Sequence, residues 1–182
     1  MEEYVYTDIM VDIETTGLDP DRNAILQIGA IAFEYDTMLV DSKNIFKRSL
    51  GIPVRRFWDE DTEYFWKVDN KDVYFEIASC AERYDHVLSD FHGWVRNYDG
   101  ARFWCKGLNF DWPFLESYFK ECNLVMPFDF RQAKDTRSFI AGLQRSGHYD
   151  EPDVDHVGSK HDAVNDCLTQ ILALKKAKND TL

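Results

Sequence analysis

Apolar residues in the first fifty positions form short runs that are rich in β-branched side chains. One run covers residues 8–14, a longer one covers residues 24–33, and a third, residues 38–47, follows a turn at 35–37. Such runs are typical of β-strands, and consecutive strands joined by short connections usually pair with each other. The pattern therefore predicts a mixed sheet whose first three strands are antiparallel.

Beyond position 51 the spacing changes. Residues 77–98 place apolar side chains at helical intervals, and residues 102–106 form a short strand that ends at Gly107. Residues 145–160 are polar and predict a loop. Four further helices are predicted. One begins at a cap formed by Asp61 and Thr62, and the next has Pro113 in its first turn. The other two run from Asp135 to about 143 and over residues 162–178. Strands followed by alternating helices and strands indicate an α/β domain of three layers.

Composition indicates a single folded domain over residues 1–182, with 45% apolar and 15% aromatic residues. No apolar run has the length of a membrane span, and the first residues are acidic. The four cysteines are scattered, which favours reduced thiols and a cytoplasmic protein. The net charge of −12 argues against a general nucleic-acid binder but permits an enzyme that holds its substrate through bound metal.

Two acids stand near the end of the first predicted strand. Asp12 and Glu14 are two residues apart, so their side chains point to the same face. Carboxylates in this arrangement repel each other and lose hydration, and the pair is tolerable if a divalent cation lies between them. Oxygen ligands suit Mg²⁺ or Mn²⁺ better than Zn²⁺. The alternative is a strand on a solvated face, with both acids in water.

Three more residues complete the candidate chemistry. Asp111 precedes Pro113 at a strand-to-helix junction, where it could also be a simple helix cap. Asp166 lies in the last helix, five residues after His161. Asp162 is an alternative to Asp166, one turn earlier on the same stripe. His156 is an alternative to His161, although its surroundings fit no motif.

With these residues the sequence resembles the DEDDh 3′–5′ exonucleases of the ribonuclease-H-like superfamily, over nearly its whole length. It is similar to the small stand-alone branch that includes exoribonucleases. The motifs and their order carry the resemblance: Asp12-Ile-Glu14-Thr-Thr-Gly with residues 25–30 of the next strand, Asn109-Phe-Asp111 with Phe114 and Leu115, and His161 separated by four residues from Asp166. The resemblance implies a ribonuclease-H-like three-layer fold.

The resemblance also implies a reaction. Hydrolysis would proceed from the 3′ end of RNA or DNA and release nucleoside 5′-monophosphates, with an exoribonuclease favoured. Two Mg²⁺ or Mn²⁺ ions would be held by Asp12, Glu14, Asp111 and Asp166, with Asp12 bridging them. His161 would be the general base, because imidazole titrates near neutral pH. Small relatives are often dimers, so a homodimer is an open alternative.

Substrate contacts are predicted from the same resemblance. Thr15 and Thr16 would cradle the terminal nucleotide, Gly17 would permit close approach of the backbone, and Leu18 would lie as an apolar wedge beside the last base. Phe110 could stack on a base, and core packing is the alternative for it or for Trp112.

Two other functions compete with the exonuclease. One is a non-catalytic module on the same fold that binds a nucleic-acid end or a protein, which the net charge favours. The other is an acidic metal-binding protein, which lacks the support of an EF-hand-type loop. A full set of clustered, mutually repelling acids favours the enzyme over both.

Overall fold

The centre of the sheet is β1 (Asp8–Thr15), which lies between β2 (Ile25–Phe33) and β5 (Arg102–Cys105). It pairs antiparallel with β2 and parallel with β5. These relations come from a computed structural model of the chain, which describes residues 5–144 and 148–180. β2 pairs with β1 along the whole strand, whereas β5 pairs only with Asp8–Met10, so the second half of β1 is held by ladder hydrogen bonds on one side.

The sheet has six strands in the order β4-β3-β2-β1-β5-β6. β3 (Phe46–Leu50) pairs antiparallel with β2, so the first three strands are antiparallel as the sequence predicts. The short strands β4 (Ala81–Glu82) and β6 (Lys134–Asp135) add in parallel at the two edges. The mixed α/β sheet is therefore confirmed.

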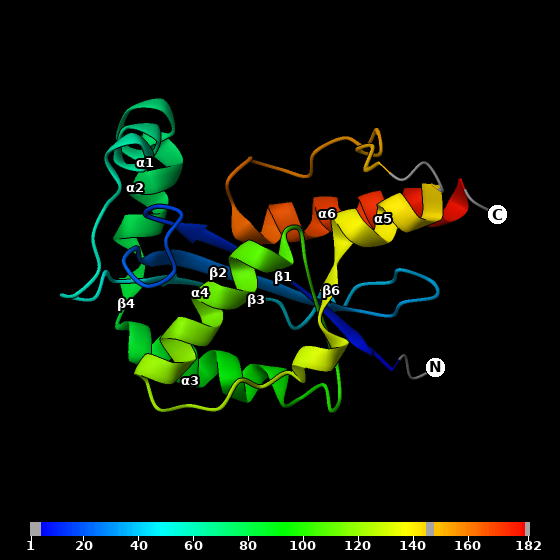
Figure 1. Cartoon of the computed structure of the whole chain (residues 1–182), viewed down its shortest axis with the longest axis horizontal. Coiled ribbons are helices and arrows are strands. Elements are labelled where there is room, and N and C mark those ends of the chain that lie inside the picture. Colours follow the sequence, from blue (N-terminus) through cyan, green and yellow to red (C-terminus); the bar gives the residue numbers. More distant parts are fainter. Residues whose placement is uncertain (1–4, 145–147, 181–182) are drawn as a thin grey trace.

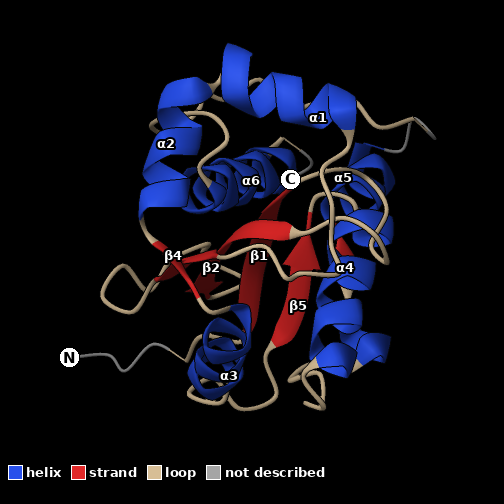
Figure 2. Ribbon diagram, turned by 90° about the vertical axis from the view of Figure 1, so that its left-hand side faces the viewer, coloured by secondary structure: helices blue, strands red, loops and turns tan. Residues whose placement is uncertain are grey.

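Helices cover both faces of the sheet and one of its ends (Figures 1 and 2). One face carries α3 (Tyr84–Val95) and α4 (Leu108–Glu121), and the opposite face carries α5 (Thr136–Gln144) and α6 (Ala163–Asn179). The end is covered by α1 (Glu60–Tyr64), the π-helical turn η1 (Phe65–Asp69) and α2 (Lys71–Ser79). A 3₁₀ turn, η2 (Phe130–Gln132), precedes β6.

The alternation of side chains along β1 divides the core in two. Ile9, Val11 and Ile13 belong to the cluster beneath α3 and α4. Met10 belongs to the cluster beneath α6. Asp12, two residues beyond Met10, therefore points toward α6, as does Glu14. The prediction that both acids share a face is confirmed, and that face is covered by a helix instead of by open solvent.

Helix α6 approaches the sheet closely at its first turn. A Cβ atom placed on Gly29 of β2 would lie 2.4 Å from the carbonyl carbon of Ala163, so only glycine fits there. Beside it, Gln27 accepts a hydrogen bond from the backbone N–H of Ala163 at 3.0 Å. This contact brings the start of α6 against the strand that pairs with Asp12 and Glu14.

The bounds of the third predicted strand, residues 38–47, are wrong. Met38 has a φ of 58°, a left-handed conformation that belongs to a turn, and a single bridge joins Val40 to Phe33. The strand β3 begins only at Phe46 and continues to Leu50. The apolar residues before it cover the edge of the core without forming a ladder.

A continuous helix over residues 77–98 is also wrong. Helix α2 ends at Ser79, and the next residues form β4, in which Ala81 pairs with Ser49 of β3. Helix α3 starts only at Tyr84. Pairing with a distant strand overrides the local helical spacing, and apolar periodicity does not reveal such pairing.

Candidate active site

The last part of β1 presents a cluster of carboxylates. One oxygen each from Asp12, Glu14 and Asp166 can be chosen so that all three atoms lie within 4.8 Å of one another. Two of these residues come from β1 and the third from the first turn of α6. Hard oxygen donors in such proximity are the ligands that Mg²⁺ and Mn²⁺ prefer. The residues present thus fit a divalent cation.

Asp166 and its rival Asp162 have different roles. The Asp162 carboxylate caps α6 by accepting hydrogen bonds from the backbone N–H groups of Val164 and Asn165, and it also pairs with Lys47. Asp166, four residues later, faces the acids of β1. Asp162 is therefore occupied with the start of the helix, and Asp166 belongs to the cluster.

Asp111 contributes a fourth carboxylate from the opposite side of the sheet. It lies in the first turn of α4 and is only 4% exposed. The predicted alternative of a helix cap is wrong, because α4 starts at Leu108 with Gly107 in the capping position. Burial raises the pKa of Asp111 to about 7, although hydrogen bonds from the Cys105 thiol and the backbone lower it.

Burial dominates the electrostatics of the cluster. The pKa values of Asp12 and Glu14 are raised well above their ordinary range, first by burial and then by repulsion from neighbouring acids, which include Asp111 and Asp166. Buried, mutually repelling carboxylates are costly unless a cation compensates them. The electrostatics thus agree with the donor chemistry, and both indicate a metal centre.

A buried amide also contacts the cluster. Gln170, one turn after Asp166 on α6, donates a hydrogen bond from Nε2 to Oδ1 of Asp12 at 2.8 Å. The sequence analysis missed this residue. Its spacing of four from Asp166 on a helix is the signal that could have found it.

Both candidate histidines lie near the acids, on the segment that precedes α6. Nε2 of His156 lies 2.7 Å from Oδ1 of Asp166. The ring of His161 makes edge-to-face contacts with Phe65 and Trp66, at centroid distances of 4.9 and 6.0 Å, and its φ is 62°. The local sequence around His156 fits no motif, yet the fold brings its ring into contact with Asp166, a predicted metal ligand.

The loop after β1 carries most of the predicted substrate contacts. Leu18 is 79% exposed, as a wedge beside a base would require. Thr16 is fully buried, and its hydroxyl donates to the carbonyl of Phe57 and accepts from the N–H of Ala24, so its side chain holds the loop. Thr15 donates its hydroxyl hydrogen bond to the carbonyl of Gly17. Any substrate role for these residues stays a prediction.

Gly17 and Phe110 are placed by packing. A Cβ atom on Gly17 would lie 2.4 Å from the Asn23 side chain, so the close approach it permits is to this chain's own loop. Phe110 is partly buried, and its ring centre lies 5.0 Å from that of Phe114. Trp112 contacts Phe103 at 5.2 Å. Trp112 thus packs in the core, and so does part of the Phe110 ring, as the core-packing alternative predicts.

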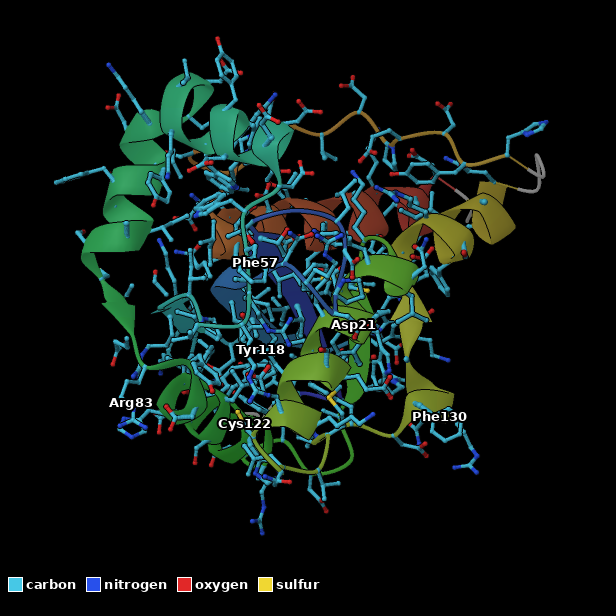
Figure 3. The ribbon with its side chains drawn as sticks, turned by 60° about the vertical axis from the view of Figure 1, so that its left-hand side comes forward. Asp21, Phe57, Arg83, Tyr118, Cys122 and Phe130 are labelled. Carbon is cyan, nitrogen blue, oxygen red and sulfur yellow. The ribbon has the colours of Figure 1, made fainter. Side chains whose placement is uncertain are left out.

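A buried arginine, Arg56, holds the loop that follows β1. Arg56 donates hydrogen bonds to the carbonyls of Pro20 and Asn23, at 2.7 and 2.8 Å. Its guanidinium lies 3.9 Å from the ring centre of Tyr118, which is labelled with Phe57 in Figure 3. The Tyr118 hydroxyl in turn accepts the N–H of Ile25. These contacts hold the ends of the loop that carries the exposed Leu18.

A cavity of about 490 Å³ opens over these groups. Its wall includes three of the acids, both histidines and Gln170. Three cationic residues also line it, Lys106, Arg137 and Lys160. A cavity that combines a carboxylate cluster with nearby cations suits a phosphate-containing ligand bound with metal.

Two solved structures that share this fold are nucleases. Cell-death related nuclease 4 has a TM-score of 0.70 and 19% identity, over 97% of this chain and 65% of that one. E. coli exonuclease I in complex with a dT13 oligonucleotide has a TM-score of 0.72 and 15% identity, over 93% of this chain and 40% of that one. The fold is thus that of the ribonuclease-H-like exonucleases.

Comparison of the sequence with protein families assigns the chain to one family. The chain belongs to the family described as the 3′-5′ exoribonuclease Rv2179c-like domain, whose model matches residues 7–177. It is 21% identical to the exodeoxyribonuclease of Enterobacteria phage T4, over 93% of this chain and 88% of that protein. It is 27% identical to the PolC-type DNA polymerase III of Thermotoga petrophila, over 79% of this chain but only 9% of the polymerase. The resemblance to 3′–5′ exonucleases is confirmed.

No helix among residues 5–144 and 148–180 combines the length and apolar character needed to cross a bilayer.

Proposed function

We propose that this chain is a metal-dependent 3′–5′ exonuclease that hydrolyses RNA and releases nucleoside 5′-monophosphates. The observation that carries the proposal is the cluster of Asp12, Glu14 and Asp166, which lies partly exposed in the wall of the cavity and close enough to the buried Asp111 to feel its charge. RNA is favoured by the description of the family. The relative from phage T4 is named an exodeoxyribonuclease, so DNA is the competing substrate.

The four carboxylates would hold two Mg²⁺ or Mn²⁺ ions. When bound, such ions stabilise the charge that develops on the attacking and leaving oxygens of a phosphodiester. Asp12 would bridge the two ions, because the charges of Glu14, Asp111 and Asp166 all act on it. Its place on β1, paired with Gly29 of β2, and its hydrogen bond from Gln170 hold it in position.

His161 is proposed as the general base. Both histidines line the cavity, but Nε2 of His156 is already engaged by Asp166. His161 would take a proton from the water whose oxygen attacks the terminal phosphorus. The bond between phosphorus and the 3′ oxygen then breaks, its electron pair stays on that oxygen, and the oxygen takes up a proton. The products are a nucleoside 5′-monophosphate and a strand with a new 3′ hydroxyl.

Leu18 and the ring of Phe110 are proposed to contact the terminal nucleotide. Leu18 has the exposure that such a contact needs. Phe110 is partly buried, so it could offer a base only the part of its ring that packing leaves open. Thr15 and Gly17 would act through the backbone of the loop that their contacts shape.

The test follows a 5′-labelled RNA oligonucleotide and its DNA counterpart, each incubated with Mg²⁺ or with Mn²⁺. The proposal predicts a ladder that shortens from the 3′ end, faster on RNA, and no products with a chelator. Equal or faster shortening of DNA would overturn the assignment of RNA. Internal cuts would indicate an endonuclease, and no cleavage by folded, metal-bound protein would favour the non-catalytic binding module.

A further inference from the structure

Gln170 is placed unusually for a long polar side chain. It is 7% exposed, lies on the face of α6 that meets β1, and lines the cavity above the acids. At such an interior position of a helix the backbone groups hydrogen-bond to one another, so the Gln170 amide is not needed as a helix cap. A buried amide on this face has to be explained by its partners.

The first partner is Asp12. The distance of 2.8 Å from Nε2 to Oδ1 is that of a good hydrogen bond. Asp12 is ionised when it ligates a cation, and the amide then has to donate to it, because a flipped amide would turn its carbonyl oxygen toward a carboxylate. The bond engages one carboxylate oxygen and leaves the other to a ligand. It also opposes burial and the neighbouring acids, which raise the pKa of Asp12.

The second partner is missing from the protein. Oε1 of Gln170 is buried and accepts no hydrogen bond from the described residues, and among the buried side-chain nitrogen and oxygen atoms of residues 5–144 and 148–180 it alone has no partner. Buried acceptors without a donor are rare and costly in folded proteins. An atom of this kind next to a cluster of metal-ligating oxygens points to a donor that arrives with the ligand.

We propose that Gln170 is the positioning residue of the metal centre: its amide N–H holds Asp12 facing Glu14 and Asp166, and its carbonyl oxygen accepts a hydrogen bond from a water that hydrates the bound ion. This inference rests on the proposed function and adds a group that is not itself a ligand. Divalent cations such as Mg²⁺ retain several waters, and each of these is a strong donor. Groups that orient ligands in this way contribute strongly to metal affinity.

The test measures Mn²⁺ binding by titration calorimetry, without substrate, in the wild type and in Gln170→Met. Methionine keeps the length and volume of the side chain and removes both hydrogen-bonding groups. We expect the affinity for Mn²⁺ to fall by about 10- to 100-fold. We also expect the maximal rate to recover at saturating Mn²⁺, because the ligands themselves remain.

Leu172→Ala is the matched control. It shortens a side chain on the same helix that is 40% exposed, and it should leave the affinity for Mn²⁺ unchanged. Gln170→Asn is the second variant, because its amide is one methylene too short to reach Asp12; it decides the matter if Gln170→Met does not fold. Wild-type affinity in a folded Gln170 variant would overturn the inference.

The two proposals fail in different ways. Wild-type protein that binds Mn²⁺ but cleaves neither RNA nor DNA would overturn the exonuclease and leave the role of Gln170 to be judged by the affinities. Wild-type protein that cleaves from the 3′ end, with unchanged Mn²⁺ affinity in Gln170→Met, would overturn the role of Gln170 alone.

Discussion

Asp12 and Glu14 project from the middle of the sheet, whereas His156 and His161 are carried by the irregular segment before α6. The acids are fixed by pairing of β1 with β2, opposite Gly29 and Gln27, and by a helix packed above them. The histidines are fixed by a few side-chain contacts, to Asp166 in one case and to two aromatic rings in the other. The proposed metal-binding half of the site is therefore part of the sheet and its covering helix, whereas the proposed proton-transfer half depends on a few side-chain contacts.

Because the acids and the histidines are held so differently, substitutions in the two sets should have different effects on metal binding and on the rate. Loss of an acid should remove the metal and the reaction together. Loss of a histidine should slow the reaction and leave metal binding intact. The following changes, in order of decreasing effect, test this separation.

The largest effect is expected from Asp12→Asn. We expect the rate of hydrolysis to fall by about 1000-fold or more, because stabilisation of the reacting oxygens by metal contributes several kcal/mol. The metal-free protein should become more stable, since one buried, repelled charge is gone. The measurements are single-turnover hydrolysis and thermal unfolding. Asp21→Asn, which removes an exposed charge from a nearby loop, is the control that should change neither.

The histidines come next. His161→Ala should lower the rate by about 100-fold, at the lower end of what loss of a general base costs, with Mn²⁺ affinity close to that of the wild type. His156→Ala should have a smaller effect on the rate. Rate and affinity are measured on the same preparations, with His86→Ala on the exposed side of α3 as control. A larger loss in His156→Ala than in His161→Ala would reverse the assignment of the base.

A third effect concerns stability and pH. A carboxyl whose pKa is raised on folding stabilises the folded state at low pH, and this contribution is lost as the pH rises through the raised pKa. For Asp111 the window runs from its ordinary value of 3.8 to about 7. With a chelator present, the wild type should therefore lose stability across this window relative to Asp111→Asn, by on the order of a few kcal/mol.

Added Mg²⁺ should reverse this loss above pH 7, because the ionised acids are the form that binds metal. Thermal unfolding of both proteins from pH 4 to 8, with chelator and with Mg²⁺, provides the comparison. A difference between the wild type and Asp111→Asn that does not change with pH would contradict burial as the cause of the raised pKa.

The smallest effect is expected from Leu18→Ala. The side chain is 79% exposed, so its loss should leave the unfolding temperature unchanged. The KM for a single-stranded substrate should rise by about fivefold, because the lost contact with the terminal base is worth on the order of 1 kcal/mol. Val54→Ala, at a position 97% exposed, is the control. An unchanged KM would remove Leu18 from the substrate contacts.

The same contrast explains what could be predicted from the sequence. The first two strands follow from β-branched runs, and Asp12 and Glu14 follow from their spacing within one of them. Pairing between distant segments has no such local signal, so β4 was hidden within an apparent helix. The early start of α4, which moves Asp111 from a cap into the first turn, was hidden in the same way.

His156 and Gln170 show the limit for the site. The position of His156 depends on the path of an irregular segment, and its local sequence matches no motif. Gln170 lies one turn beyond Asp166, so helical spacing places it on the correct face. Only the depth of the contact between α6 and the sheet, set at Gly29, shows that its amide reaches Asp12.

The most direct test of the account is anomalous diffraction from crystals of the wild-type protein grown with Mn²⁺. The account predicts two anomalous peaks within ligand distance of Asp12, Glu14, Asp111 and Asp166, and their loss in Asp12→Asn. Mn²⁺ bound elsewhere on the surface, with none among these four carboxylates, would contradict the claim that the centre of the sheet is a metal-dependent active site.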